Sequence, residues 1–210
     1  MLKERDLKLE ARVERLYDAD LPYHNFQHVN DTLAAAHDII ARCNEEGVPV
    51  NAQVVYLALL FHDAGYRDDH ERLGYPSKER YSAVLAESLL SEYGIERSVI
   101  DMVMAAIEST HRDASFSSIE QKAVRAADLS GLAADYEKFR HHTEELRQEH
   151  HLLTGESIAW NEWVAQSSAV VRFYLDQELT LSSYFYSGDD ESSFHQRIRA
   201  NVERLAEDLD

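Results

Sequence analysis

The chain has 210 residues, a length that predicts one domain with a sizeable hydrophobic core. Hydrophobic residues make up 44% and charged residues 29%, which excludes a disordered chain. The 39 acidic and 21 basic residues leave a net charge of −18. This charge argues against binding to nucleic acids or anionic membranes, because both need positive charge. A small anionic substrate remains compatible if the site supplies local positive charge, for instance from a metal ion.

The single cysteine, Cys43, excludes an internal disulfide, and the lack of a disulfide framework favours a reducing compartment. The longest apolar run is far shorter than a membrane span, and the first residues carry charges where a signal peptide is apolar. We therefore expect a cytoplasmic protein that binds neither membranes nor nucleic acid. The oligomeric state is not predicted by the residues.

The chain contains only 7 Gly and 3 Pro, most of which stand where a helix would end. Between these breaks the apolar residues recur at helical spacing. The pattern predicts eight helices, and a ninth at the end of the chain, over 2–19, 26–46, 51–63, 77–93, 95–111, 117–128, 131–153, 156–179 and 192–209. Strand-like alternation is confined to the short patch 182–186. We therefore expect an all-α bundle.

Several polar residues predict where helices begin. Asn25 precedes one apolar stripe and fits the N-cap of its helix. The pairs Ser117 with Glu120, and Ser193 with Gln196, have the spacing of capping boxes.

Four polar residues stand where the core of a helical protein should be apolar. His62 and Asp63 follow the apolar run 54–61, which predicts a helix buried in the middle of the bundle. A buried carboxylate is costly unless it is paired or bound to a metal, and the negative end of a helix favours a cation. His28 falls in the first turn of its helix, and Asp128 follows another apolar-rich segment.

Two imidazoles and two carboxylates suit a divalent first-row metal ion such as Mn²⁺, Fe²⁺, Co²⁺ or Ni²⁺. A structural zinc site of the cysteine type is disfavoured, because no thiolate is available near these residues. Taken alone, each of the four residues is weak evidence, because a lone histidine in a helical bundle is more often a hydrogen-bonded core residue. Only their combination points to a metal site.

His28, the adjacent pair His62-Asp63, and Asp128 resemble the H…HD…D ligand set of the HD superfamily of metal-dependent phosphohydrolases. Further motifs are similar to those of one bacterial subfamily of HD phosphohydrolases, namely Tyr23-His24-Asn25-x-x-His28, Phe61-His62-Asp63-Ala64-Gly65-Tyr66, Glu79-Arg80-Tyr81-Ser82-Ala83, Thr110-His111 and Asp128-Leu129-Ser130-x-Leu132. Several ordered motifs are more specific than a lone doublet. The resemblance covers residues 20–135. It implies one HD-type domain over residues 1–210, a helical bundle with a metal site in its core, completed by helices in 136–210.

The resemblance implies that His28, His62, Asp63 and Asp128 bind one or two divalent ions, with Mg²⁺ added to the candidate metals. It also implies hydrolysis of a phosphate ester or anhydride in a nucleotide or another small phosphorylated metabolite. The metal would lower the pKa of a bound water and polarise the phosphoryl oxygen. Asp63 would orient that water or take its proton.

Three further residues are candidates through the same motifs. Glu79 would act as a general acid or base, or would orient a metal ligand, although it also fits a solvated residue in a first helical turn. His111 would bind a second metal or protonate the leaving group, although it also fits an exposed histidine at a helix C-terminus. His24 would hydrogen-bond a ligand or the phosphate.

Phosphate contacts would come from basic residues close to these motifs, although each one alone fits a surface charge. These residues are Arg67, Arg112, Lys122 and Arg125.

Other functions stay open at this stage. An HD-type scaffold with a di-iron centre would perform oxygenation, but it would need histidine ligands beyond the four residues named above. A non-catalytic module would use the metal site to bind a nucleotide or to stabilise the fold. A helical interaction protein would bind no metal at all.

Overall fold

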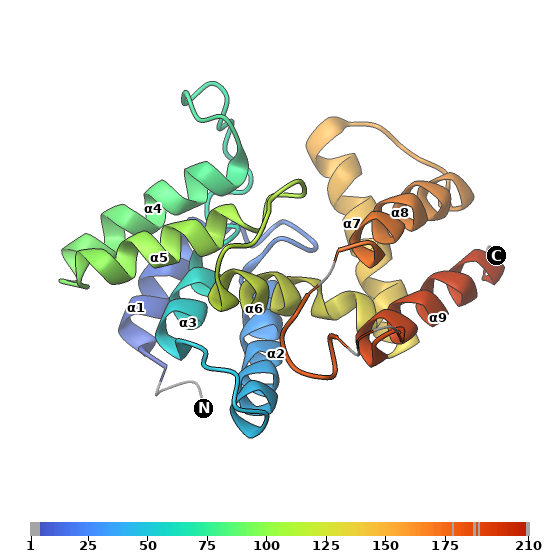
Figure 1. Ribbon diagram of the computed structural model, residues 1–210. Helices are drawn as coiled ribbons and strands as arrows, with labels where there is room; N and C mark the ends of the chain where they lie inside the picture. Colours follow the sequence, from blue (N-terminus) through green and yellow to red (C-terminus); the bar gives the residue numbers. More distant parts are fainter. Residues whose placement is uncertain (1–4, 178, 187, 189, 209–210) are drawn as a thin grey trace. The chain divides into compact units, whose positions relative to one another are not determined.

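The computed structural model describes residues 5–177, 179–186, 188 and 190–208, and over these residues the fold is all-helical (Figure 1). The α-helices are α1 (Leu7–Val13), α2 (Phe26–Glu45), α3 (Ala52–Phe61), α4 (Lys78–Glu92), α5 (Arg97–Glu108), α6 (Ile119–Asp128), α7 (Tyr136–Thr154), α8 (Trp160–Leu175) and α9 (Ser193–Glu207). Two 3₁₀ segments, Glu14–Leu16 and Leu129–Ala133, follow α1 and α6. The predicted all-α class, with eight or nine helices, is confirmed.

The chain divides into two compact units, each of which is described by itself. The first contains residues 1–20 and 24–128 and carries α1 to α6, whereas the second contains 21–23 and 129–210 and carries α7 to α9. A single domain over residues 1–210 stays a prediction. Within the described residues, no helix is both long and apolar enough to cross a lipid bilayer.

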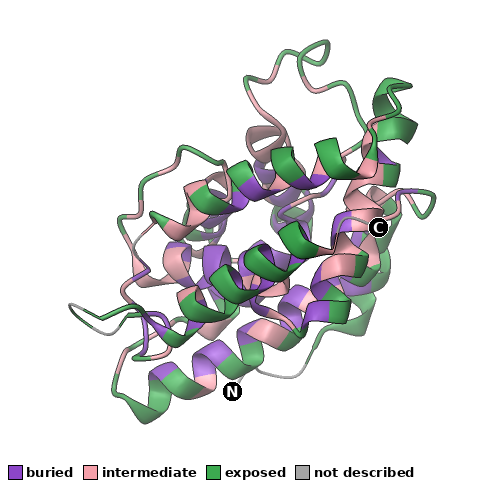
Figure 2. Ribbon diagram, turned by 90° about the vertical axis from the view of Figure 1, so that its right-hand side faces the viewer, coloured by how far each residue is buried: buried purple, intermediate pink, exposed green. Residues whose placement is uncertain are grey.

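Helix α3 forms the centre of the first unit. All eight of its residues from Val54 to Phe61 are buried, and the helix packs against α2, α4, α5 and α6. A helix that is apolar on every side must be enclosed in this way, as the sequence predicted. Of the surrounding helices, α2, α4 and α5 instead carry both buried and exposed residues along their length, as the ribbon coloured by burial illustrates for the molecule (Figure 2).

The first helix is shorter than the predicted range 2–19. Asp6 caps α1 by accepting hydrogen bonds from Lys8 N and Leu9 N, and residues 2–4 of the predicted range lie outside the described residues. After the 3₁₀ segment the chain becomes extended at Tyr17. The helical conformation stops at Leu16, whose carbonyl oxygen accepts a hydrogen bond from Gly65 N, in the turn after α3, at 2.9 Å.

The capping box of α6 lies one residue beyond the predicted pair Ser117 and Glu120. Gln121 N donates to Ser118 Oγ at 3.3 Å, and Ser118 N donates back to Gln121 Oε1 at 3.1 Å. Gln121 Nε2 also donates to Ala105 O of α5 at 3.3 Å. This contact with α5 explains why Gln121, and not Glu120, forms the capping box.

The cap of α9 is displaced by one residue as well. Ser192, and not Ser193, accepts the hydrogen bond from His195 N. Within the second unit, α9 packs on α7, α8 and the 3₁₀ segment Leu129–Ala133. Asn201 Nδ2 secures that segment by donating to Leu132 O and Ala134 O, each at 2.9 Å.

Candidate metal centre

His28 is positioned by the capped start of α2. The Asn25 side chain accepts hydrogen bonds from Gln27 N at 2.8 Å and from His28 N at 3.4 Å. This is the N-cap that the sequence predicted, and it satisfies backbone donors that have no partner inside the helix. His28 therefore sits in a defined first turn, where its side chain is 6% exposed.

His62 is oriented by the end of α3. Its Nδ1 lies 2.8 Å from Leu59 O, and because a carbonyl oxygen only accepts, Nδ1 carries the proton. In the neutral imidazole the lone pair is then on Nε2. This Nε2 is fully buried and faces carboxylate oxygens, which cannot donate a hydrogen bond to it, the nearer being Asp63 Oδ2 at 2.9 Å. A buried nitrogen lone pair without a donor is well suited to a cation.

The turn after α3 holds Asp63 in place. Gly65, two residues later, has a φ of +72°, a left-handed conformation that strongly favours glycine. Tyr17 Oη donates to Leu60 O at 3.0 Å, and Ser82 Oγ of α4 donates to Ala64 O at 2.8 Å. Together with the hydrogen bond from Gly65 N to Leu16 O, these contacts tie both sides of Asp63 to other segments.

Asp128 is the last residue of α6, and its side chain lies beside those of His28, His62 and Asp63. Helix α6 packs against α2 and α3, and its residues Ala123 to Ala127 are all buried. The fourth side chain thus comes from a third helix, as in other metal sites of helical proteins.

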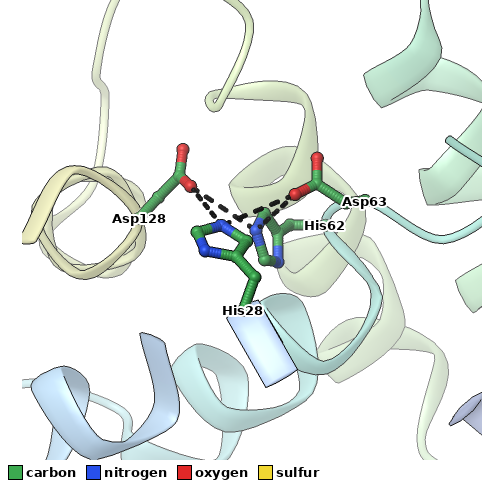
Figure 3. A group of neighbouring side chains, drawn as sticks. All are labelled: His28, His62, Asp63 and Asp128. Atoms are coloured by element: carbon green, nitrogen blue, oxygen red, sulfur yellow. Dashed lines mark hydrogen bonds and ion pairs between the residues drawn. The ribbon is translucent and has the colours of Figure 1, made fainter. Parts of the chain in front are cut away.

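The four side chains converge on one point (Figure 3). One ligand atom from each of His28, His62, Asp63 and Asp128 lies within 4.8 Å of the other three. His62 Nε2 is 2.9 Å from Asp63 Oδ2 and 3.5 Å from Asp128 Oδ1. His28 Nε2 is 3.3 Å from Asp128 Oδ1 and 3.7 Å from Asp63 Oδ2. The sequence had singled out all four residues.

The spacing of these atoms fits a divalent metal ion. Bonds of about 2.0–2.2 Å place neighbouring ligand atoms about 2.8–3.6 Å apart in octahedral and tetrahedral sites. The four nitrogen–oxygen distances, from 2.9 to 3.7 Å, nearly coincide with that range. Neutral imidazoles and carboxylates also suit the Mn²⁺ to Ni²⁺ series. The group could therefore hold a metal ion.

Without a metal, the buried groups stabilise one another as ion pairs. Burial lowers the pKa of His62, but Asp63 and Asp128 outweigh this effect and raise it well above the usual value. Burial would raise the pKa of Asp63, yet His62, with a smaller contribution from His24, lowers it to about 2. The pKa of Asp128 is lowered well below its usual value, because His28 and His62 outweigh its burial.

The cluster has a closed end and a more open end. The side chains of His28 and His62 are 6% and 1% exposed, whereas those of Asp63 and Asp128 are 17% and 19% exposed. The second oxygen of each carboxylate points away from the imidazoles (Figure 3). A water molecule or substrate would therefore reach the cluster from the carboxylate side.

Glu79 and His111 do not belong to this group of four. Glu79 is half-buried in the first turn of α4. His111, just after α5, is also half-buried, and its Nδ1 accepts a hydrogen bond from Asp113 N at 3.3 Å. Their catalytic roles stay predictions.

The interpretation of Arg125 as a surface charge is wrong. Its side chain is buried, and its guanidinium donates to Thr110 O at 2.9 Å and to His111 O. Arg125 thereby supplies hydrogen bonds to carbonyl groups just beyond the end of α5. Arg67 is exposed, as expected, and forms an ion pair with Asp18.

Two supporting residues were given no role by the sequence. Tyr17 lies outside every motif, and its contact with α3 spans 43 positions of the sequence. Ser82 belongs to the Glu-x-x-Ser-Ala motif, and its burial gives that motif a structural role beside the turn that follows Asp63.

No protein-family model matches the chain, and no curated protein matches its sequence. The resemblance to the HD superfamily therefore depends on the motifs themselves, and membership of that family stays a prediction.

Proposed function

We propose that the protein is a metal-dependent phosphohydrolase of the HD type, which cleaves a phosphate ester or anhydride in a nucleotide or another small phosphorylated metabolite. The observation that carries the proposal is the convergence of two imidazole nitrogens and two carboxylate oxygens within 4.8 Å. The buried His62 Nε2 adds support from the same site, because it lies 2.9 Å from Asp63 Oδ2 and 3.5 Å from Asp128 Oδ1, and all three atoms can bind one cation. The order of the motifs along the chain supplies the reaction class.

In this proposal His28, His62, Asp63 and Asp128 hold the divalent ion. Once bound, such an ion lowers the pKa of a coordinated water and polarises a phosphoryl oxygen. Asp63 stays ionised at neutral pH, because its pKa is about 2 in the metal-free site. Its second oxygen, on the more exposed side, is then free of the imidazoles and can accept a hydrogen bond from the attacking water.

The experiment combines metal analysis with a substrate panel. The metal content of the purified protein is measured first, and phosphate and pyrophosphate release is then followed with nucleotides and sugar phosphates in the presence of Mn²⁺. Asp63→Ala and His28→Gln remove members of the cluster. His37→Gln is the matched control, because His37 is an exposed histidine on the same helix as His28.

We expect both cluster variants to lose about a hundredfold or more of the turnover and the control to keep it. Absence of turnover in a folded, Mn²⁺-loaded wild-type protein, across the whole panel, would contradict the proposal. Stabilisation by a nucleotide without turnover would then favour the non-catalytic module. Visible absorption of aerobically purified protein would instead favour the di-iron oxygenase.

A further inference from the structure

Three side chains from separate segments form a stack in the first unit. The rings of His24 and Tyr66 are stacked, with centroids 3.8 Å apart and an interplanar angle of 11°. Lys78 Nζ lies 3.5 Å from the Tyr66 ring centroid. Since the lysine and the imidazole cannot share one face of the ring at these distances, Tyr66 lies between them. The loop before α2, the turn after α3 and the start of α4 thus meet in this stack.

The stack ends beside the metal cluster. The His24 and His28 rings are in edge-to-face contact, with centroids 6.0 Å apart. His24, Tyr66 and Lys78 are all half-buried, so the stack is accessible at its margin.

The charge balance of the metal site indicates that a phosphate anion needs an additional binding group beside the metal. A divalent ion held by the carboxylates of Asp63 and Asp128 leaves a net charge of about zero, so an arriving phosphate anion needs further donors or positive charge. Two arginines that the sequence had offered for this purpose are engaged elsewhere. Arg125 is buried against carbonyl groups, and Arg67 is paired with Asp18.

We propose that His24, held in place by Tyr66 and Lys78, binds the phosphate oxygens of the substrate beside the metal cluster. This inference rests on the proposed function and assigns the anion contact of the same site. Stacking removes rotational freedom from the imidazole before the anion arrives, which lowers the entropic cost of binding. The ammonium group on the far side of the ring adds positive charge. Tyr66 and Lys78 are positioning residues in this arrangement.

The test measures binding of inorganic phosphate to the Mn²⁺-loaded protein by calorimetry, together with the Mn²⁺ affinity of each variant. His24→Ala should weaken phosphate binding about tenfold or more, which is the usual effect of losing a charge-assisted hydrogen bond. Tyr66→Leu should weaken it several-fold, whereas Tyr66→Phe, which keeps the stack, should restore wild-type binding. Mn²⁺ affinity should stay unchanged throughout, and His37→Ala serves as the exposed control on α2.

Two results would overturn the inference. One is wild-type phosphate affinity in His24→Ala, and the other is a loss of Mn²⁺ affinity that accounts for the weaker phosphate binding. If His24→Ala does not fold, the two Tyr66 variants decide, because equal phosphate affinities in both would reject the positioning role.

Turnover on the substrate panel separates this inference from the proposed function. A wild-type protein that hydrolyses substrates but binds no phosphate would contradict only the inference about His24. A metal-loaded protein that neither hydrolyses substrates nor binds phosphate would contradict both that inference and the proposed function.

Discussion

Gly65→Ala should disturb both the stability of the protein and the metal centre, because Gly65 lies two residues after Asp63 in a crowded turn. Its φ is +72°, and an added Cβ would lie 2.5 Å from Tyr81 Cε1 and 3.0 Å from Leu85 Cδ1. The Tyr81 ring cannot easily move away, since its hydroxyl donates to Asp68 Oδ2 at 2.9 Å. The substitution therefore combines backbone strain with a steric clash.

Gly94 provides a control that measures the cost of backbone strain without a steric clash. Its φ is +70°, nearly the same as that of Gly65, but an added Cβ would meet no atom within 4 Å. The left-handed conformation costs an alanine about 1–2 kcal/mol, and overpacking a dense site adds about 1–3 kcal/mol. We expect Gly94→Ala to lower the free energy of unfolding by the first amount and Gly65→Ala by the sum, about 2–5 kcal/mol.

Urea unfolding of the two variants and of the wild type measures these differences. Calorimetric titration with Mn²⁺ should also show weaker binding in Gly65→Ala and unchanged binding in Gly94→Ala, because only the former displaces the turn that holds Asp63. In a Tyr81→Ala background the cost of Gly65→Ala should fall, since the closest clash is removed. Equal destabilisation by Gly65→Ala and Gly94→Ala would refute the steric part of the reasoning.

Three further predictions concern the cluster and helix α2, which carries His28. His28→Gln should abolish stoichiometric Mn²⁺ binding, whereas His37→Gln should retain it; equal binding in an equilibrium dialysis experiment would contradict the proposed ligand set. Although burial lowers the pKa of His62, the two carboxylates of the cluster raise it well above its usual value, so the metal-free site holds a proton at neutral pH. Binding of Mn²⁺ must displace this proton, and its affinity should therefore rise with pH, with about one proton released in calorimetry across buffers of different ionisation enthalpy. A pH-independent affinity between pH 6 and 8 would contradict that charge state. Asn25→Ala should remove the cap of α2 and lower the free energy of unfolding by about 1 kcal/mol, measured in urea, whereas an unchanged value would mean that the observed cap contributes little.

The helices were predictable where local pattern and tertiary structure agree. The range 26–46 was expected to be helical and α2 spans Phe26–Glu45, because a capping Asn, an apolar stripe and a closing Gly all coincide there. The range 2–19 was too long, since the contact of Leu16 with the turn after α3 overrides local helical preference. A contact between segments so distant in sequence leaves no periodic signal.

The same distinction applies to the candidate metal centre. His62 and Asp63 were visible in the sequence because polar residues directly after a wholly apolar run must be satisfied by something in the folded protein. Arg125 offered the same signal, a charged residue inside the apolar-rich segment 123–127, and was misinterpreted because its partners are backbone carbonyl groups of residues 110 and 111. Carbonyl groups that need a donor are specified by where a helix ends in space, not by side-chain identity. A buried charge in an apolar run thus shows that a partner exists, and only the fold shows whether that partner is a metal, a side chain or the backbone.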